Sequence, residues 1–186
     1  RRGPVTLPVI GALGAGRMGR GIAHAFAFAG HEVRLIDAKP RSADDARRLA
    51  DEALAEVDRS LALVASLGGF DDALRPRMLA RVRFVAREEA PAALADCALV
   101  FEGVPETLNA KREAFAFASP HLRPDAVLAS TTSTMLSTEL AAMVARPERF
   151  LNAHWLNPAY LVPLVELSPH PGTAPEALAR TRAILE

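Results

Sequence analysis

The sequence predicts an α/β domain with a doubly wound, mostly parallel sheet and a long helical excursion after the second strand. Three observations lead to this fold class. Half of the 186 residues are hydrophobic and 24% are charged, which is typical of a chain that forms a core. Short apolar runs of strand length alternate with helical segments along the chain. Such alternation favours a parallel sheet covered by helices on both faces.

The first 37 residues contain the clearest elements. Residues 9–13 form a short apolar run that predicts a buried strand. Apolar residues then recur every three or four positions up to Ala29, which predicts an amphipathic helix that Gly30 ends. Residues 32–37 predict a second strand. Together these elements make a βαβ unit.

The remaining elements follow from the same patterns. An Ala-, Arg-, Glu- and Leu-rich stretch predicts a long helix over 42–66, which Gly68 and Gly69 separate from a shorter helix over 71–80. Further strands are predicted at 82–85, 98–102, 127–129, 150–154 and 164–167, and further helices at 106–118, 137–144 and from 176 onward. No helix stop signal follows Leu185, so we expect the chain to end inside an element.

Composition limits the partners and the compartment. The chain has 22 basic and 22 acidic residues, so it lacks the basic excess of a nucleic-acid or membrane-surface binder. The single cysteine, Cys97, excludes an internal disulfide framework and a clustered-cysteine zinc site, and we expect no metal. No apolar run approaches the ~18 residues of a membrane span. Residues 1–8 lack the apolar segment of a signal peptide. We expect a cytoplasmic protein with a small-molecule ligand.

The segment Gly14-Ala15-Gly16-Arg17-Met18-Gly19 fits the G-x-G-x-x-G pattern between a predicted strand and a predicted helix. Gly14 permits the tight turn, Gly16 lets a pyrophosphate approach the backbone, and Gly19 lets the helix pack closely on the strand. The start of the helix, at Arg17 and Met18, offers N–H groups and a positive dipole end to phosphates. The pattern predicts a Rossmann-type dinucleotide site. The alternative is a tight turn with no ligand.

Asp37 ends the second predicted strand, 23 residues after Gly14. This offset is close to that of the acid that binds the adenosine ribose in dinucleotide folds. A carboxylate there accepts hydrogen bonds from a 2′-hydroxyl and repels a 2′-phosphate, so NAD is favoured over NADP. Lys39 and Arg41 are close enough to weaken that preference. The alternative is that Asp37 is a solvated strand end.

Three further segments carry a resemblance. They are Phe101-Glu102-Gly103-Val104-Pro105-Glu106-Thr107-Leu108-Asn109-Ala110-Lys111, then Ser130-Thr131-Thr132-Ser133-Thr134, then His154-Trp155-Leu156-Asn157-Pro158 followed by Val165-Glu166. In order and spacing, from residue 9 to residue 166, they resemble the L-3-hydroxyacyl-CoA dehydrogenase family. The resemblance implies an NAD-binding Rossmann-type domain that oxidises the 3-hydroxy group of a 3-hydroxyacyl-CoA to a 3-oxo group, in fatty acid metabolism.

The residues themselves suit that proton transfer. The imidazole of His154 can accept a hydroxyl proton near neutral pH. Glu166, twelve residues further on, can accept the other ring N–H and so fix the tautomer and favour the imidazolium. The resemblance assigns the same roles, general base to His154 and orienting partner to Glu166. A histidine after an apolar strand is otherwise more often structural.

The resemblance places other residues around the reacting centre. Ser133 is expected to bind the substrate oxygen and the cofactor, and Asn157 to lie beside the nicotinamide. Glu106 and Lys111 are expected near the nicotinamide ribose, with Glu102 lining the same cleft. Lys111 is one of only two lysines in an arginine-rich chain, which favours a functional role. The alternatives are a polar loop around Ser133, a turn at Asn157, a first-turn acid of a helix for Glu106 and an exposed basic residue for Lys111.

The sequence also departs from the family. Thr131 stands where much of the family has asparagine. Residues 157–167 are closer to the L-gulonate 3-dehydrogenase and lambda-crystallin branch, which leaves a small non-CoA hydroxy acid as an alternative substrate. In the family the CoA moiety contacts the helical excursion, where Arg47, Arg48 and Arg59 are available to phosphates. A solvated helical face is the other interpretation of these three arginines.

Finally, the resemblance implies a C-terminal, mostly helical domain that forms a homodimer and contributes another active-site asparagine. Residues 1–186 match only the NAD-binding domain, and we expect the chain to stop before the second one. A third hypothesis follows. The chain is then a module that binds NAD and does no chemistry without its partner domain.

Overall fold

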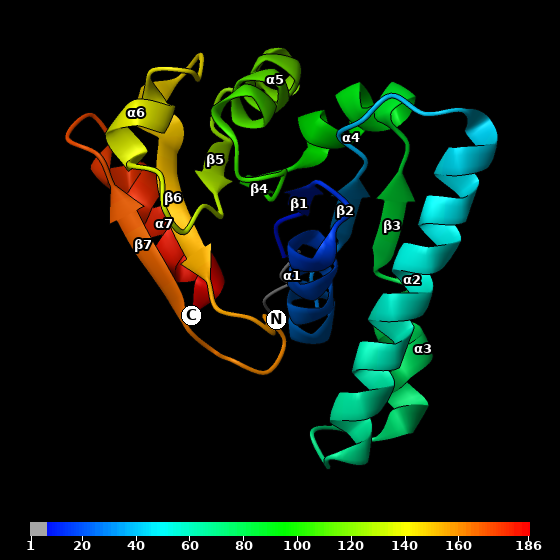
Figure 1. Ribbon diagram of the computed structural model, residues 1–186. Helices are drawn as coiled ribbons and strands as arrows, with labels where there is room; N and C mark the ends of the chain where they lie inside the picture. Colours follow the sequence, from blue (N-terminus) through cyan, green and yellow to red (C-terminus); the bar gives the residue numbers. More distant parts are fainter. Residues whose placement is uncertain (1–6) are drawn as a thin grey trace, which may run out of the picture.

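A seven-stranded sheet forms the centre of the computed structural model, which describes residues 7–186 (Figure 1). Residues 1–6, which include most of the segment searched for a signal peptide, lie outside the described residues. The strands are β1 (Ile10–Leu13), β2 (Val33–Ile36), β3 (Val82–Val85), β4 (Leu99–Glu102), β5 (Val127–Ser130), β6 (Phe150–Trp155) and β7 (Val165–Pro169). All seven lie where the sequence predicts them, within one or two residues.

The strand order is β3-β2-β1-β4-β5-β6-β7. The first six strands are parallel to one another, and only β7 runs antiparallel, beside β6. The predicted doubly wound, mostly parallel sheet is therefore confirmed. The order reverses between β1 and β4, so the loops after these two strands diverge. In open α/β sheets this crevice, at the carboxyl ends of the strands, is where ligands bind.

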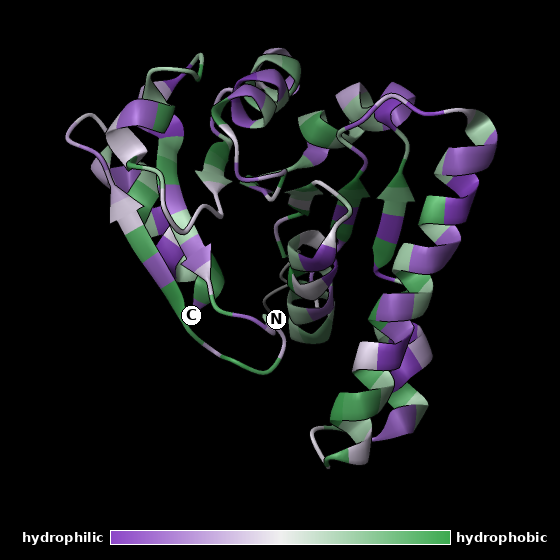
Figure 2. Ribbon diagram, in the orientation of Figure 1, coloured by the Kyte–Doolittle hydropathy of each residue, from purple (hydrophilic) through white to green (hydrophobic). Residues whose placement is uncertain are grey.

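Helices cover both faces of the sheet. They are α1 (Arg17–Ala29), α2 (Ala43–Ser66), α3 (Arg75–Leu79), α4 (Ala90–Asp96), α5 (Leu108–Ala118), α6 (Ser137–Ala141) and α7 (Pro175–Leu185). One core cluster joins the sheet to α1, α2, α3 and α7, and a second joins it to α4, α5 and α6. Figure 2 shows α2 as mixed bands of hydrophilic and hydrophobic residues, as expected for a helix with one buried side.

Local sequence explains where the helices begin and end. Gly30 ends α1 in the left-handed region, at φ 103°, where glycine is favoured. Ser42 caps α2, because its side chain accepts the N–H of Asp45. The helix predicted over 71–80 is instead a 3₁₀ turn (Asp72–Leu74) followed by α3, since Asp71 caps the turn and Pro76 starts a new helix. The sequence analysis missed α4, whose seven residues are too few to show a helical period.

None of the helices within residues 7–186 is long and apolar enough to cross a membrane.

Candidate active site

The carboxyl ends of β1, β2 and β4 open into a cavity of about 1390 Å³. Its walls include the glycine turn after β1, Asp37 after β2, the segment 103–107 after β4 and Asn157 after β6. Four segments that are far apart in the sequence therefore meet at one edge of the sheet. Most of the residues predicted to bind the cofactor line this single cavity.

The glycine turn has the geometry that its sequence predicts. Gly14 has φ +111°, and a Cβ atom there would lie 2.9 Å from the carbonyl oxygen of Gly103. A Cβ atom on Gly19 would lie 1.9 Å from the carbonyl oxygen of Gly14. A Cβ atom on Gly16 would meet nothing within 4 Å, so the backbone there faces open space. Two glycines therefore permit close packing, and the third leaves room for a ligand.

The N-terminus of α1 faces the same cavity. Arg17 and Met18 are its first two residues, Gly16 is its N-cap, and no side chain caps it. Its first turn carries no acidic residue. Backbone N–H groups and the positive end of the helix dipole are thus available to an anion.

Arg20 is a supporting residue that the sequence analysis did not identify. It is buried, its Nε donates to the carbonyl oxygen of Ala15 over 2.9 Å, and its Nη1 pairs with Glu52 at 2.9 Å and with Glu56. Burial lowers its pKa, but the two glutamates outweigh that effect and raise it. Arg20 thereby ties the glycine turn to α2. An arginine on the buried side of a helix, with acids expected on the next helix, was the available signal.

Asp37 lies at the end of β2 with only 3% of its surface exposed. Its two carboxylate oxygens accept the backbone N–H of Lys39 over 3.1 Å and the Nε of Arg41 over 2.6 Å. Asp37 is therefore fixed in place rather than being a freely solvated strand end. These residues fit the adenosine half of a dinucleotide: open backbone for the phosphates and a fixed carboxylate for the ribose.

His154 and Glu166 face each other across β6 and β7, where they form a register pair. Nδ1 of His154 and Oε2 of Glu166 lie 2.7 Å apart, which is the contact that the sequence predicted. The side chains are 30% and 61% exposed, respectively. A carboxylate can only accept at this position, so the contact favours the proton on Nδ1, and the neutral tautomer with that proton has its lone pair on Nε2. The strand pairing sets this geometry.

Ser133 is exposed in the loop after β5, and Glu106 holds that loop. Oε1 of Glu106 accepts the hydroxyl of Thr132, the backbone N–H of Ser133 over 3.1 Å and the hydroxyl of Thr134 over 3.1 Å. Thr107 is the N-cap of α5, so Glu106 precedes the helix. The alternative that Glu106 is a first-turn acid of that helix is therefore wrong.

Lys111 and Glu102 form a buried ion pair. Their side chains are 1% and 0% exposed, and Nζ of Lys111 lies 2.9 Å from Oε1 of Glu102. Nζ also lies 3.1 Å from Oε2 of Glu106. The alternative that Lys111 is an exposed basic residue is wrong, because the whole ammonium group is inside the domain.

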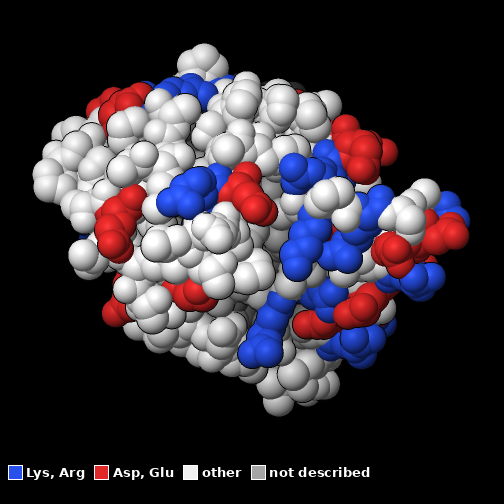
Figure 3. Space-filling model, turned by 45° about the horizontal axis from the view of Figure 1, so that its top comes forward, with Lys and Arg blue, Asp and Glu red and all other residues white. Residues whose placement is uncertain are grey.

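The three arginines considered for CoA phosphates, Arg47, Arg48 and Arg59, separate into two groups. Arg59 lines a second cavity, of about 500 Å³, between α1, α2 and the segment 157–160. Asn157 lines both cavities and so connects them. Arg47 and Arg48 are exposed and pair with Asp44 and Asp45 on the same helix. Figure 3 shows Lys and Arg side chains gathered on the right-hand half of the view, with Asp and Glu side chains between and around them.

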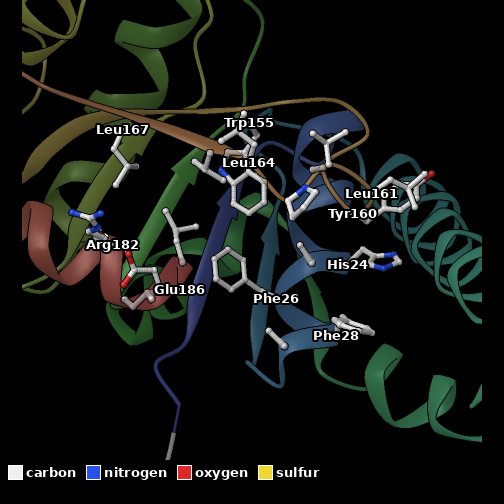
Figure 4. Close-up of a pocket in the computed structure, with 18 of the residues that line it drawn as sticks. His24, Phe26, Phe28, Trp155, Tyr160, Leu161, Leu164, Leu167, Arg182 and Glu186 are labelled. Atoms are coloured by element: carbon white, nitrogen blue, oxygen red, sulfur yellow. Dashed lines mark hydrogen bonds and ion pairs between the residues drawn. The ribbon is translucent and has the colours of Figure 1, made fainter. Parts of the chain in front are cut away.

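A third cavity, of about 770 Å³, is an apolar groove lined by α1, the segment 159–165 and α7. Figure 4 shows Phe26 and Phe28 on one wall and Leu161, Leu164 and Trp155 along the other. Phe28, Leu161 and Leu164 are 44%, 45% and 50% exposed. Contiguous exposed apolar surface of this kind is typical of interaction sites and of ligand-binding grooves.

Fold and site together define a dinucleotide-binding domain of the dehydrogenase class. The family model described as "3-hydroxyacyl-CoA dehydrogenase, NAD binding domain" matches residues 9–186. The chain therefore belongs to the 3-hydroxyacyl-CoA dehydrogenase family, as the resemblance predicted, and NAD is the cofactor of this domain.

Individual relatives agree with the family. The chain is 40% identical to a 3-hydroxybutyryl-CoA dehydrogenase of Bradyrhizobium diazoefficiens over 85% of the chain and 50% of that protein. It is 37% identical to a lambda-crystallin homolog of Bos taurus over 95% of the chain and 52% of that protein. The crystal structure of M. tuberculosis FadB2 matches at a TM-score of 0.85 and 34% identity, over 97% of the chain and 60% of FadB2. The chain thus spans about half the length of the curated relatives it matches.

Proposed function

We propose that the protein catalyses the NAD-dependent oxidation of a 3-hydroxyacyl-CoA to a 3-oxoacyl-CoA. The observation that carries this proposal is the His154–Glu166 pair, held at 2.7 Å at the same end of the sheet as the cavity with the glycine turn and Asp37. The similarity to proteins named 3-hydroxybutyryl-CoA dehydrogenase supports the choice of substrate.

In this proposal His154 is the general base. Nε2 removes the proton of the 3-hydroxyl group as the C3–H bond breaks and the C–O double bond forms. NAD⁺, which the glycine turn and Asp37 would hold, would supply the hydride acceptor for C3. Glu166 keeps the proton on Nδ1 and stabilises the imidazolium that results. Ser133 and Asn157 position the substrate oxygen, since one is exposed after β5 and the other lines the cavity after β6.

We propose the cofactor contacts that the sequence predicted. They are Gly14, Gly16, Arg17, Met18, Gly19, Asp37, Glu106, Lys111 and Ser133. Burial of Lys111 supports an indirect contribution, through Glu106, more than direct contact. For Asp37 the test is the Asp37→Ala variant, titrated with NAD⁺ and NADP⁺ by calorimetry. We expect a Kd for NAD⁺ raised about tenfold and a smaller preference over NADP⁺. An unchanged ratio of the two affinities would remove Asp37 from cofactor selection.

A small 3-hydroxy acid that is not a CoA ester is the second candidate substrate. The similarity to lambda-crystallin homologs over 95% of the chain favours it. Arg47 and Arg48 also pair with Asp44 and Asp45 on their own helix and line neither the cavity at the glycine turn nor the second cavity. The test is NADH formation by the complete gene product from 3-hydroxybutyryl-CoA and, separately, from L-gulonate. A higher kcat/KM for 3-hydroxybutyryl-CoA supports our proposal, and a higher kcat/KM for L-gulonate supports the alternative. NADH from neither substrate contradicts both.

We also propose that a second, helical domain covers the apolar groove and forms a homodimer, and that the enzyme acts in the cytoplasm in fatty acid metabolism. The exposed side chains of the groove and the length of the relatives support the second domain. Hydrogen exchange of residues 161–165, compared between residues 1–186 alone and the complete gene product, is the test. Equal exchange rates would contradict a covered groove. If residues 1–186 bind NAD⁺ without turnover and the complete gene product restores it, the chain alone is an inactive binding module.

A further inference from the structure

A chain of buried polar contacts links the ends of β4 and β5. Glu102, the last residue of β4, is a register pair with Ser130, the last residue of β5. Oε2 of Glu102 accepts the hydroxyl of Ser130 over 2.7 Å, and its Oε1 accepts the backbone N–H of Val104 over 2.7 Å. Lys111 donates to the same Oε1 over 2.9 Å. Every donor and acceptor here comes from a different segment, so Glu102 connects β4, β5 and α5.

Lys111 passes this restraint on to Glu106. Its Nζ lies 2.9 Å from Oε1 of Glu102 and 3.1 Å from Oε2 of Glu106. Glu106 is more exposed than either of the other two, and without Lys111 its position would be set by the loop alone. Partial burial raises the pKa of Glu106, but the hydrogen bond from Thr132 and the charge of Lys111 lower it to about 2. Glu106 is therefore a carboxylate that only accepts.

The other carboxylate oxygen of Glu106 is directed at the loop that carries Ser133. It accepts three donors from residues 132–134, one of which is the backbone N–H of Ser133 itself. The far end of the loop is held from β6, where Nδ2 of Asn152 donates to the carbonyl oxygen of Met135 over 2.9 Å. Asn152 is two residues before His154. The loop is thus held between Glu106 on one side and the strand of His154 on the other.

We propose that Glu102 and Lys111 are positioning residues that fix Ser133 relative to His154 by holding Glu106. This inference rests on the proposed function, in which Ser133 binds the substrate oxygen. A buried ion pair adds little net stability over apolar residues of the same size, because desolvation of both charges offsets their attraction. Its directional contacts, in contrast, determine where Glu106 points. A misplacement of about 1 Å at a reacting centre lowers turnover by up to about 100-fold.

The test separates positioning from stability by removing one charge or both. Lys111→Met alone leaves Glu102 buried without its cation, so the variant is destabilised. The double variant Glu102→Gln with Lys111→Met has no unpaired buried charge. We therefore expect its melting temperature to lie closer to that of the wild type than to that of Lys111→Met alone. In that double variant Glu106 still lacks its contact with Nζ of Lys111. We therefore expect kcat in the complete gene product to stay about 10- to 100-fold below that of the wild type.

A second readout follows the loop itself, without any turnover. The backbone N–H groups of residues 132–135 donate to Ser130, Glu106 and Thr132. We expect their hydrogen exchange to be at least about fivefold faster in the double variant, with the exchange of β1 unchanged. The matched control is Arg83→Met with Glu89→Gln, which removes an ion pair whose side chains are 61% and 60% exposed and far from the loop in the sheet order. It should change neither readout.

Several results would overturn the inference. A double variant with wild-type kcat and wild-type exchange would show that the pair has only a structural role. A weaker affinity for NAD⁺ with unchanged exchange of the loop would instead make Lys111 a direct cofactor ligand. Failure of the proposed function is recognised separately, because the wild type would then form no NADH from 3-hydroxybutyryl-CoA. The exchange experiment would still decide whether the buried pair holds the loop.

Discussion

Two pairs of ionisable side chains lie near the same edge of the sheet, and they differ in exposure. The side chains of Lys111 and Glu102 are 1% and 0% exposed, whereas those of His154 and Glu166 are 30% and 61% exposed. The contact distances are similar, 2.9 Å and 2.7 Å. The contact distance therefore does not distinguish the two pairs. They differ in whether a ligand can reach their side chains.

Access determines which chemistry each pair supports. A buried pair with every group hydrogen-bonded has no site for a substrate proton, so its charges serve to direct neighbouring groups. The exposed pair leaves Nε2 of His154 open to a ligand. The general lesson is that a short charged contact in an active site is assigned to proton transfer or to positioning by its burial and its free lone pairs.

The substitution His154→Gln in the complete gene product tests the exposed pair most severely. Without a base, we expect kcat to fall by about 10²- to 10⁴-fold, while the Kd for NAD⁺ stays within about threefold. Steady-state kinetics and calorimetry measure the two quantities. The control is His170→Gln, since His170 contacts the backbone of Pro147 at the far end of β7. Near-normal turnover of His154→Gln would show that His154 is not the general base.

The substitution Lys111→Met tests the buried pair. It leaves the carboxylate of Glu102 inside the domain without its cation, so we expect the free energy of unfolding to fall by about 3–5 kcal/mol. Arg83→Met, in an exposed pair on β3, should cost less than about 1 kcal/mol. Urea denaturation of residues 1–186 measures both. If the free energy of unfolding fell equally in the two variants, burial would not determine what an ion pair contributes to stability.

His24 extends the comparison to a histidine that is buried. It is 2% exposed, its Nδ1 lies 2.7 Å from Oγ of Ser60, and its ring stacks on Tyr160. Burial lowers the pKa of His24 to about 4. The unfolded chain, with an ordinary histidine pKa near ~6.5, therefore binds a proton before the folded chain does.

Stability from this site is fully present above about pH 6.5 and is lost as the pH falls toward 4, by up to about 3 kcal/mol. Urea unfolding at pH 7 and at pH 5 measures this loss. In His24→Gln the difference between the two pH values should shrink. If the variant keeps the wild-type pH dependence, another group is responsible, and burial does not control the proton affinity of His24.

The fold was largely predictable because its signals are local. Short segments of strand length located all seven strands, and Gly30 marked the end of α1. The short helix α4 was missed, since seven residues show barely two turns of periodicity. The antiparallel direction of β7 was not predicted either. A short apolar run predicts a strand but does not indicate whether that strand runs parallel or antiparallel to its neighbour.

For the site, local motifs predicted which residues meet but not how deeply they are buried. The glycine turn, Asp37 and the His154–Glu166 contact follow from spacing and strand pairing. The burial of Lys111 depends on Glu102 at the end of β4, whose other oxygen is held by Ser130, and strand register brings Glu102 and Ser130 together from separate parts of the sequence. Arg20 was missed for the same reason, because its acidic partners lie more than thirty residues away on α2.

The smallest expected effect is on stability, in the exposed pair. Glu166→Gln removes a charge that is 61% exposed, so the free energy of unfolding should change by less than about 1 kcal/mol, although turnover falls because His154 loses its orienting partner. Urea denaturation and kinetics on the same preparation measure both. A loss of stability comparable to that of Lys111→Met would mean that the His154–Glu166 contact holds β6 and β7 together. The lowered turnover would then report damage to the sheet, and the assignment of this pair to proton transfer would lose its support.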